Sequence, residues 1–442
     1  MTDLTVYDQL LLELVNRARL DPVTEANRLG IGLNADLPFA IIDGSAKQPL
    51  APDELLSTAA SDHSLWMLDT DTFSHQGVGG SSPGDRMTAA GYVFTGSWTW
   101  GENIAWSGTT GTPNVEAYTK QLHDNLFRSA GHRVNLLDDT YREVGIGVES
   151  GAFTSGGTTF NSVMATENFA TSGSDVYVTG VVITDADGDN FYDIGEARAG
   201  IWVSVSAGGV VAGTDDTGTA GGYAVSAAGG TLDVQFSGGD LLSSVSVTVE
   251  AGARNAKVDL LGASEILSSA NTTLGLGAID LVLLGVAALS GTGNDSANHL
   301  VGNRAANVLA GAGGNDTLTG GAGRDVLTGG EGADWFDFNA RSETARTMST
   351  ADVITDFARG LDRIDLAGID ARTTASGNQA FRWLGSGAFT GSAGQLRYQK
   401  YDQAGTDLDV TMVMGDVNGD KKVDFAIVLT GLHGLSSADF VL

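Results

Sequence analysis

This sequence lacks the features of several common protein classes. It contains no cysteine, which excludes a disulfide framework and thiol catalysis. Proline is scarce, with 6 residues in 442, so the 62 glycines do not by themselves indicate disorder. No apolar run approaches the ~20 residues that a helix needs to span a bilayer. The first stretch, MTDLTVYDQLLLELVNRARLDP, has no basic region and has helical apolar spacing, so it predicts an amphipathic helix rather than a signal peptide.

Positive charge is also in short supply. The chain has 24 Lys and Arg against 54 Asp and Glu, which gives a net charge of −30. This balance argues against nucleic acid and anionic membranes as partners. The acidic residues cluster with glycine in predicted loops, which suits divalent cations better than a charge that serves solubility alone.

A nine-residue repeat fills residues 293–337. The five units read GNDSANHLV, GNRAANVLA, GAGGNDTLT, GGAGRDVLT and GGEGADWFD. Glycine opens each unit and Asn or Asp stands sixth. The eighth position is apolar, at Leu300, Leu309, Leu318, Leu327 and Phe336. A period this strict is typical of a stacked repeat architecture, although a glycine-rich flexible linker is the plain alternative.

The repeat suits the binding of a hard cation. Glycines allow a tight turn whose carbonyl oxygens converge, and a carboxylate at the sixth position completes an oxygen cage. The x-apolar-x tail predicts a very short strand that is stable only when several units stack. The predicted Ca²⁺ ligands are Asn307, Asp316, Asp325 and Asp334, with Gly311, Gly313, Gly320 and Gly329 in the turns.

This repeat resembles the RTX (repeats-in-toxin) family. The resemblance implies a parallel β-roll that binds several Ca²⁺ ions between turns two repeats apart. It would pair Asp316 with Asp334 on one side and Asn307 with Asp325 on the other. Asn298 and Asn307 depart from aspartate, so the first two repeats are expected to bind weakly or to act as an N-terminal cap.

Residues 1–172 predict a mixture of helices and strands. Helical spacing recurs at the start, after Pro52 and over 115–127, and strands are predicted over 143–149 and 161–169. Three patches stand out: FSHQGVGGSSPGDRMTAAGY (73–92), GENIAW (101–106) and SAGHRVNLL (129–137). In this order they resemble the bacterial CAP, or SCP-like, superfamily. The resemblance implies an α-β-α sandwich with an open cleft that holds two His and two Glu.

Three of these four residues map onto His75, Glu102 and His132, while the helix that carries the fourth offers only Glu116, His123 and Asp124. His75 and His132 with a carboxylate could hold Zn²⁺, or the same groups could act as acid-base catalysts. The alternative is structural, with hydrogen-bonded polar groups at loop junctions and Arg133 in an ion pair. No G-x-S-x-G elbow is present, so a serine hydrolase is disfavoured.

Residues 176–261 alternate Val with polar residues between Gly and Asp turns, which predicts a small antiparallel β-sandwich that acts as a spacer. Its first loop, DADGDNFYDIGE, has the spacing of a calcium loop. The expected ligands are Asp185, Asp187, Asp189, the Phe191 carbonyl, Asp193 and Glu196. The region resembles B-type and prealbumin-like modules of bacterial surface proteins. A plain acidic surface turn is the alternative.

Residues 262–292 are expected to lead into the roll. Residues 338–442 resemble the serralysin-type C-terminal region, which closes the β-roll and carries a type I secretion signal. A further predicted calcium loop has Asp416, Asn418, Asp420 and Asp424, but Ile427 stands where the last acidic ligand belongs. None of the six His is followed by Glu, so the zinc-protease motif H-E-x-x-H is absent.

The sequence therefore predicts a multidomain α+β protein with an N-terminal α-β-α sandwich, a middle antiparallel β-sandwich and a C-terminal parallel β-roll. It is expected to be secreted by a Gram-negative bacterium through a type I ABC exporter. The CAP-like region is then the cargo, which binds or acts on an extracellular lipid, glycan or host protein. The alternatives are a metal- or His/Glu-dependent hydrolase and a structural matrix protein.

Overall fold

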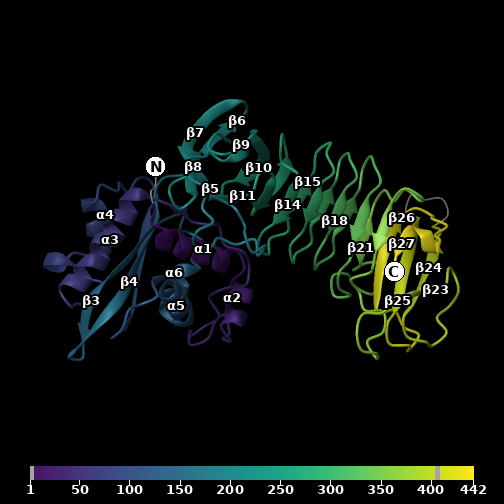
Figure 1. Ribbon diagram of the computed structural model, residues 1–442, viewed down its shortest axis with the longest axis horizontal. Coiled ribbons are helices and arrows are strands. Elements are labelled where there is room, and N and C mark those ends of the chain that lie inside the picture. The colour runs from purple at the N-terminus through teal and green to yellow at the C-terminus, as the bar shows by residue number, and fades with distance from the viewer. Residues whose placement is uncertain (1–3, 404–408) are drawn as a thin grey trace. The chain divides into compact units, whose positions relative to one another are not determined.

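A computed structural model describes residues 4–403 and 409–442 (Figure 1). The chain divides into two compact units, Met1–Ser269 and Ala270–Leu442. The first unit mixes helices with strands, and the second is built mainly of strands. The observed structure is thus mixed helix and sheet followed by a β-rich C-terminal part, as the sequence predicts at this coarse level.

The first part of unit one has six helices among the described residues and one small sheet. The helices are α1 (Val6–Leu20), α2 (Pro22–Arg28), α3 (Glu54–Asp69), α4 (Pro83–Ala89), α5 (Val115–Arg128) and α6 (Ala130–Leu136). The strands are β1 (Ala51–Pro52), β2 (Thr99–Thr109), β3 (Glu143–Ser155) and β4 (Thr158–Thr171), in the order β1-β3-β4-β2. Thr5 begins α1 with a capping box to Asp8, and Asp53 accepts two backbone N–H groups at the start of α3.

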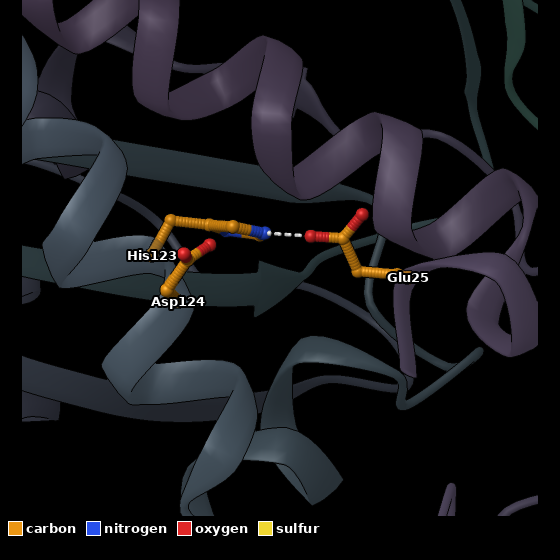
Figure 2. A group of neighbouring side chains, drawn as sticks. All are labelled: Glu25, His123 and Asp124. Atoms are coloured by element: carbon orange, nitrogen blue, oxygen red, sulfur yellow. Dashed lines mark hydrogen bonds and ion pairs between the residues drawn. The ribbon is translucent and has the colours of Figure 1, made fainter. Parts of the chain in front are cut away.

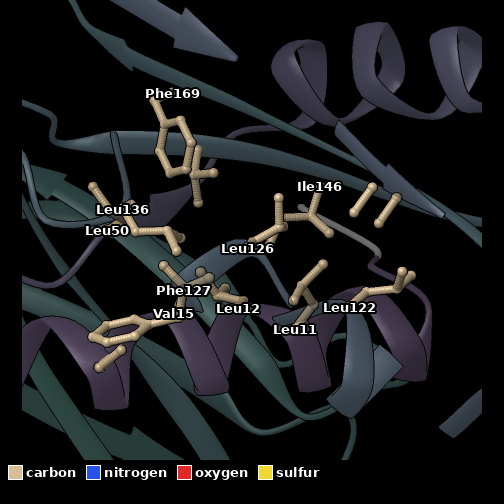
Figure 3. Close-up of a cluster of buried hydrophobic side chains, with 14 of the residues drawn as sticks. Leu11, Leu12, Val15, Leu50, Leu122, Leu126, Phe127, Leu136, Ile146 and Phe169 are labelled. Carbon is tan, nitrogen blue, oxygen red and sulfur yellow. The ribbon is translucent and has the colours of Figure 1, made fainter. Parts of the chain in front are cut away.

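Both faces of this sheet are covered by helices. On one face, Leu11 and Val15 of α1 and Phe127 of α5 pack with Ile146 and Phe169 of the sheet (Figure 3). Helix α3 covers the other face. Its backbone lies so close to β3 that a Cβ atom on Gly145 would be 1.9 Å from the Leu56 carbonyl carbon. The G-I-G sequence of this strand is therefore a packing requirement.

The second part of unit one consists of two groups of short strands. One group has the order β12-β11-β5-β8 and the other has β10-β9-β6-β7. The strands are β5 (Val176–Ile183), β6 (Trp202–Ala207), β7 (Val210–Asp216), β8 (Gly222–Ala227), β9 (Gly230–Ser237), β10 (Val245–Gly252), β11 (Ala256–Leu261) and β12 (Glu265–Ser268). The pairs within these groups are antiparallel except β5 with β11, which is parallel.

Charged and polar side chains fix this strand region to the helical part. Lys257 on β11 lies 2.7 Å from the Glu13 carboxylate on α1 and 2.6 Å from Asp259, and all three are buried. Asn255 donates to the carbonyl oxygens of Pro49 and Arg142. Buried charged groups are costly unless they are paired, so these paired contacts indicate that the strand region packs specifically against the helical part. The two parts form one compact unit, whereas the sequence suggested that the strand region is only a spacer.

Unit two begins with ten short strands. They are β13 (Asn271–Leu274), β14 (Asp280–Leu283), β15 (Ser290–Thr292), β16 (His299–Val301), β17 (Val308–Ala310), β18 (Thr317–Thr319), β19 (Val326–Thr328), β20 (Trp335–Asp337), β21 (Asp352–Ile354) and β22 (Arg363–Asp365). Each of the first eight, β13 to β20, pairs in parallel with the strand two places further along. The apolar eighth residues of the repeats are fully buried.

Five strands follow these ten: β23 (Arg382–Trp383), β24 (Gln395–Tyr401), β25 (Val410–Asp416), β26 (Phe425–Thr430) and β27 (Phe440–Val441). Strands β24, β25 and β26 form an antiparallel group, and β26 continues the repeat sheet by pairing in parallel with β21. The last strand pairs with β22. Both rows of repeat strands are thus covered at this end, which protects their edges.

Candidate functional site

The sixth-position aspartates of the repeats form two rows, one along each row of strands. Within a row, one oxygen of each carboxylate accepts a hydrogen bond from the backbone N–H of the sixth-position residue two repeats earlier in the sequence. Asp316 N–H donates to Asp334 (2.9 Å), and Asn307 N–H donates to Asp325 (2.7 Å). Side chains that are 18 residues apart in sequence are therefore neighbours in space.

The second oxygen of these carboxylates, Oδ2, differs from the first because it accepts no hydrogen bond within the described part of the chain. Oδ2 of Asp316, Asp325, Asp334 and Asp352 is buried and has no hydrogen-bond partner among the described residues. A buried carboxylate oxygen without a partner costs free energy unless a cation satisfies it. Four such atoms in one repeat region therefore indicate a place for cations.

Glycine carbonyls complete the candidate ion cradles. A Cβ atom on Gly311 would lie 2.1 Å from Asp316 Oδ2 and 2.4 Å from the Gly329 carbonyl oxygen. A Cβ on Gly329 would lie 2.2 Å from Asp334 Oδ2, and one on Gly320 would lie 2.5 Å from Asp325 Oδ2. Oxygen atoms thus gather where only glycine leaves room. A set of carboxylate and carbonyl oxygens fits Ca²⁺.

Burial affects the protonation of these carboxyl groups. It raises the pKa of Asp316 to about 6 and that of Asp325 to about 7. It also raises the pKa of Asp352 to about 8 and raises that of Asp334. A positive ion beside these groups would favour their charged forms and reverse the shift.

The first two repeats hold amide groups in place of carboxylates. Asn298 Nδ2 donates to the Ile279 carbonyl (2.8 Å), and Asn307 Nδ2 donates to the Leu289 carbonyl (3.2 Å). Asn294 and Asn303 likewise donate to carbonyls of the preceding turns. Amide hydrogens therefore satisfy carbonyl oxygens that a cation would otherwise contact, which fits the expected cap.

The loop at residues 185–196 brings three carboxylates together. Oxygens of Asp185, Asp187 and Asp189 lie within 4.8 Å of one another. Other oxygens of the loop accept its own backbone N–H groups, for example Gly188 N–H to Asp185 (3.0 Å).

The same loop also contacts the helical part. Asp193 lies 3.2 Å from Lys120 Nζ on α5, and the Phe191 ring packs under the Arg17 guanidinium. Glu196 accepts two backbone N–H groups. The acidic group fits a Ca²⁺ loop that lies against the helical part.

The second predicted calcium loop is largely satisfied by its own chain. Asp416 is buried and accepts the N–H groups of Gly419 and Lys421. Asp420 accepts Lys422 N–H, and Asn418 donates to Asp424 (3.2 Å). In the loop at 185–196, Asp185 accepts the N–H groups of Gly188 and Asn190 in the same pattern. The loop at 416–424 differs in that Asn418 stands where the first loop has the carboxylate of Asp187.

The predicted cleft residues come from three elements. His75 lies before the 3-10 turn η1 (Val78–Gly80), Glu102 lies on β2, and His132 lies on α6. His75 Nδ1 is 2.8 Å from Glu102 Oε1, and Arg86 pairs with the other Glu102 oxygen. Glu102 is 2% exposed whereas His75 is 53% exposed, so a buried carboxylate holds an accessible imidazole. Burial lowers the pKa of His132, and the nearby His75 lowers it further.

Comparison with known proteins matches each end of the chain to a protein family. Residues 12–169 match the Cysteine-rich secretory protein family (CAP), and residues 279–442 match the Peptidase M10 serralysin C terminal family. The chain carries a CAP domain followed by a serralysin-type C-terminal domain. No curated protein matches the chain.

Three solved structures are similar to parts of the chain. An extracellular SCP-domain protein of Bacillus anthracis is 23% identical (TM-score 0.25) over 37% of this chain, which spans only 39% of that protein. The AlgE6R3 subunit of the Azotobacter vinelandii mannuronan C5-epimerase is 32% identical (TM-score 0.26), over 35% of this chain and 78% of that one. The AlgE6R2 subunit is 30% identical (TM-score 0.24), over 35% and 92%.

The cleft of the CAP domain does not fit a zinc site. The guanidinium of Arg86 already lies against Glu102, where a second cation would be repelled. Within the part of the chain that the structure describes, His75, Glu102 and His132 are not among the groups of three ligand atoms close enough to share a metal ion. The geometry instead gives an accessible imidazole that is oriented by a buried carboxylate.

The three alternative residues on α5 lie elsewhere. His123 is fully buried and its Nε2 is 2.9 Å from Glu25, while Asp124 lies beside it (Figure 2). Arg28 pairs with both Glu25 and Asp124, so its guanidinium fills the place of a cation in this cluster. Glu116 pairs with Lys120. Arg133 donates to four backbone carbonyls, and no ion pair of Arg133 occurs among the described residues.

Sequence reasoning missed three residues that the structure adds to these sites. Arg86 completes the contacts of Glu102. Asp352 and Asp362 extend the aspartate rows, because they accept the N–H groups of Asp325 and Asp334. The separation of 27 residues between Asp325 and Asp352 equals three repeats, and this spacing was the available signal.

Proposed function

We propose that this protein is a secreted calcium-binding modular protein whose CAP domain is a binding or effector module for a lipid, glycan or host protein. The observation that carries the proposal is the set of buried aspartate oxygens without partners in the repeats. Calcium supplies the missing partner, so the serralysin-type domain folds fully only where Ca²⁺ is abundant.

Export through a type I ABC transporter follows from the same properties. The match of residues 279–442 to the serralysin C-terminal family supports this route. A chain with net charge −30 repels itself when Ca²⁺ is low, which keeps the repeats unfolded in the cytosol. External Ca²⁺ then neutralises the carboxylates and drives folding outside the cell. Among the described residues, no helix is long and apolar enough to cross a membrane.

A hydrolase that acts through the CAP cleft is the second candidate. The hydrogen bond between His75 and Glu102 favours it, because a carboxylate that orients an imidazole is typical of a general base. The double variant His75→Ala/His132→Ala separates the two functions. A hydrolytic activity that is lost while ligand binding persists supports the enzyme, and unchanged biological activity excludes it.

The calcium proposal is tested by hydrogen exchange of the full chain in EGTA and in CaCl₂, with a calorimetric Ca²⁺ titration. We expect Ca²⁺ to protect residues 293–365 strongly and residues 4–172 little. Asp316→Asn/Asp325→Asn should lower the number of bound ions. Asp295→Asn is the control, because this exposed repeat residue carries the same charge. Protection that does not depend on Ca²⁺ in the repeats would refute the proposal.

A further inference from the structure

Glu167 is a carboxyl group buried in the sheet of the CAP domain. It lies on β4, opposite Asn103 of β2 and Ile146 of β3, and its side chain is fully buried. Alternate strand residues share a face, so Glu167 lies on the face where Ile146 and Phe169 pack against α1 and α5 (Figure 3). Its Oε2 accepts a hydrogen bond from Asn103 Nδ2 (3.0 Å), whereas its Oε1 is buried and has no partner among the described residues. The charged form of such a group is costly to hold in place.

Glu167 also has no cationic partner among the residues that the structure describes. Glu102 on β2 and both Glu143 and Glu149 on β3 occupy strand positions of the opposite face. The buried ionisable residues on the helices of the same face bond to other groups: Asp8, Glu13 and Arg19 on α1, His123 on α5 and Arg133 on α6. Burial raises the pKa of Glu167 to about 7, and the hydrogen bond from Asn103 opposes this rise. Glu167 therefore gains its charge near neutral pH with no cation beside it.

A relay of amide groups connects Glu167 with two of the predicted cleft residues. The Asn103 amide donates one hydrogen to Glu167 and the other to the His132 carbonyl oxygen (3.3 Å). Asn103 Oδ1 accepts a hydrogen bond from Asn135 Nδ2 (3.0 Å), and the same Asn135 amide donates to the Glu102 carbonyl oxygen (3.3 Å). The relay therefore ends on the backbone of His132 and of Glu102.

These contacts join α6 to the edge of the sheet. His132 and Asn135 lie on α6, whereas Glu102 and Asn103 lie on β2, which is the outermost strand of this sheet. Consecutive strand residues point to opposite faces, so the Glu102 side chain, which binds His75, and the Asn103 side chain lie on opposite sides of β2. The position of His132 relative to the pair of His75 and Glu102 thus depends on how firmly the relay holds α6.

We propose that Glu167 is a positioning residue of the CAP cleft, whose neutral form holds α6 against β2 and whose charged form loosens it. A charged Oε1 without a partner attracts the Asn103 hydrogen that otherwise binds the His132 carbonyl, because charged acceptors form the stronger hydrogen bonds. The contact of 3.3 Å to that carbonyl is then lost. The proposal rests on the CAP cleft as a functional site and adds a control by pH to it. Its test reads the geometry of α6 rather than ligand binding or hydrolysis.

The test is nuclear magnetic resonance of the full chain in CaCl₂, with isotope labels only in asparagine and arginine. The reporters are the side-chain amides of Asn103 and Asn135 and the backbone amide of Arg133, which shares a peptide group with the His132 carbonyl. We expect all three signals to shift together in a transition at about pH 7, where Glu167 loses its proton.

Glu167→Gln cannot ionise but keeps an acceptor for Asn103. It should therefore lack this transition and keep the signals of the low-pH form. Other groups that titrate in this range do so in both proteins, so the difference between the two proteins reports Glu167 alone. Parent signals that stay constant from about pH 5 to pH 9, or a transition that persists in Glu167→Gln, would overturn the proposal.

Two further variants separate the relay from a general effect of a buried acid. Glu143→Gln is the matched control, because Glu143 is also a buried glutamate of this sheet but accepts hydrogen bonds from Tyr92 and Tyr177. It should retain the transition, and loss of the transition there would refute the assignment to Glu167. Asn103→Ala cuts the relay and should abolish the response of Arg133, and a response that survives would refute the relay. None of these outcomes depends on the number of bound Ca²⁺ ions, which the calorimetric titration tests separately.

Discussion

Glu102 is the residue on which the CAP cleft depends. Its side chain is 2% exposed, and its positive partner is Arg86 at 12% exposure. The substitution Arg86→Met would leave a buried carboxylate without its cation. We expect it to lower the free energy of unfolding of the CAP domain by about 3–5 kcal/mol. Urea unfolding followed by tryptophan fluorescence measures the loss, since four of the seven tryptophans lie before residue 110.

The control is Arg254→Met, which breaks an ion pair whose partners Arg254 and Asp139 are 51% and 39% exposed. An exposed pair contributes about 0–1 kcal/mol, so this variant should unfold nearly as the parent does. The double variant Arg86→Met/Glu102→Gln should recover part of the loss, because the unpaired charge is gone. Equal losses in Arg86→Met and Arg254→Met would contradict the role of burial.

Asn307 shows how one side chain can take the place of a metal ion. Its amide donates to the Leu289 carbonyl and its backbone N–H donates to Asp325. Asn307→Asp removes the amide donor and sets a carboxylate against a carbonyl. We expect the calcium-free protein to lose about 1–3 kcal/mol of stability, and the calcium-loaded protein to gain an additional weak Ca²⁺ site. Denaturation in EGTA and calorimetry in CaCl₂ measure the two effects.

Asn378→Asp provides the matched control for this substitution. Asn378 also donates its amide hydrogen to a carbonyl, that of Ala367, but it is exposed and lies outside the repeats. It should leave the number of bound Ca²⁺ ions unchanged. If Asn307→Asp also binds no more calcium and is equally stable in EGTA, amide replacement is not what distinguishes the first repeats.

At the scale of elements, the glycines of one repeat turn differ in whether the structure leaves room for a side chain at their position. A Cβ on Gly311 would lie 2.1 Å from Asp316 Oδ2, whereas a Cβ on Gly313 would meet nothing closer than 3.5 Å. Gly311→Ala should therefore close the ion cradle and weaken Ca²⁺ binding by at least about tenfold at that turn. Gly313→Ala should bind nearly as the parent does. Calorimetric Ca²⁺ titration of both variants tests this difference. A similar loss of Ca²⁺ affinity in both would contradict the cradle geometry.

The elements differ in how far the sequence predicts them. The repeat strands follow from local periodicity, so a nine-residue pattern places each buried apolar residue. The parallel pairing of β5 with β11 joins segments about 80 residues apart, and no local pattern encodes it. The same holds for the contact between Arg86 and Glu102, which depends on how α4 meets β2. Residue types that recur at fixed spacing are predictable, whereas partners that are chosen by packing are not.

At the scale of the whole molecule, the middle strand region is more than a connection. Its buried Lys257 pairs with Glu13 of the CAP domain, and its acidic loop at 185–196 contacts α5 through Lys120. The sequence of this region shows alternation and turns, and both are also compatible with a free-standing spacer. A spacer and a packed neighbour differ only in which side chains are buried against another part, and this information is absent from a strand pattern.

Protonation and calcium binding must be coupled in this strongly acidic chain. In the absence of Ca²⁺, burial raises the pKa of Asp316, Asp325 and Asp352 to about 6, 7 and 8. The folded calcium-free repeats thus retain protons that the unfolded chain loses above about pH 4. Since the unfolded state binds fewer protons, the stability of the calcium-free repeats falls as pH rises from about 4 to 8.

Calcium must displace those protons, so the Ca²⁺ affinity of the folded repeats should rise with pH until the last of these groups has lost its proton, at about pH 8. Calorimetry in buffers of different ionisation enthalpy counts the protons released. We expect more than one proton per protein at about pH 6 and almost none above about pH 9, because the carboxyl groups are then already charged. Asp352→Asn should reduce the release near pH 7, whereas Asp295→Asn, an exposed repeat residue, should not. Calcium affinity that is independent of pH would show that these carboxylates are not the ligands.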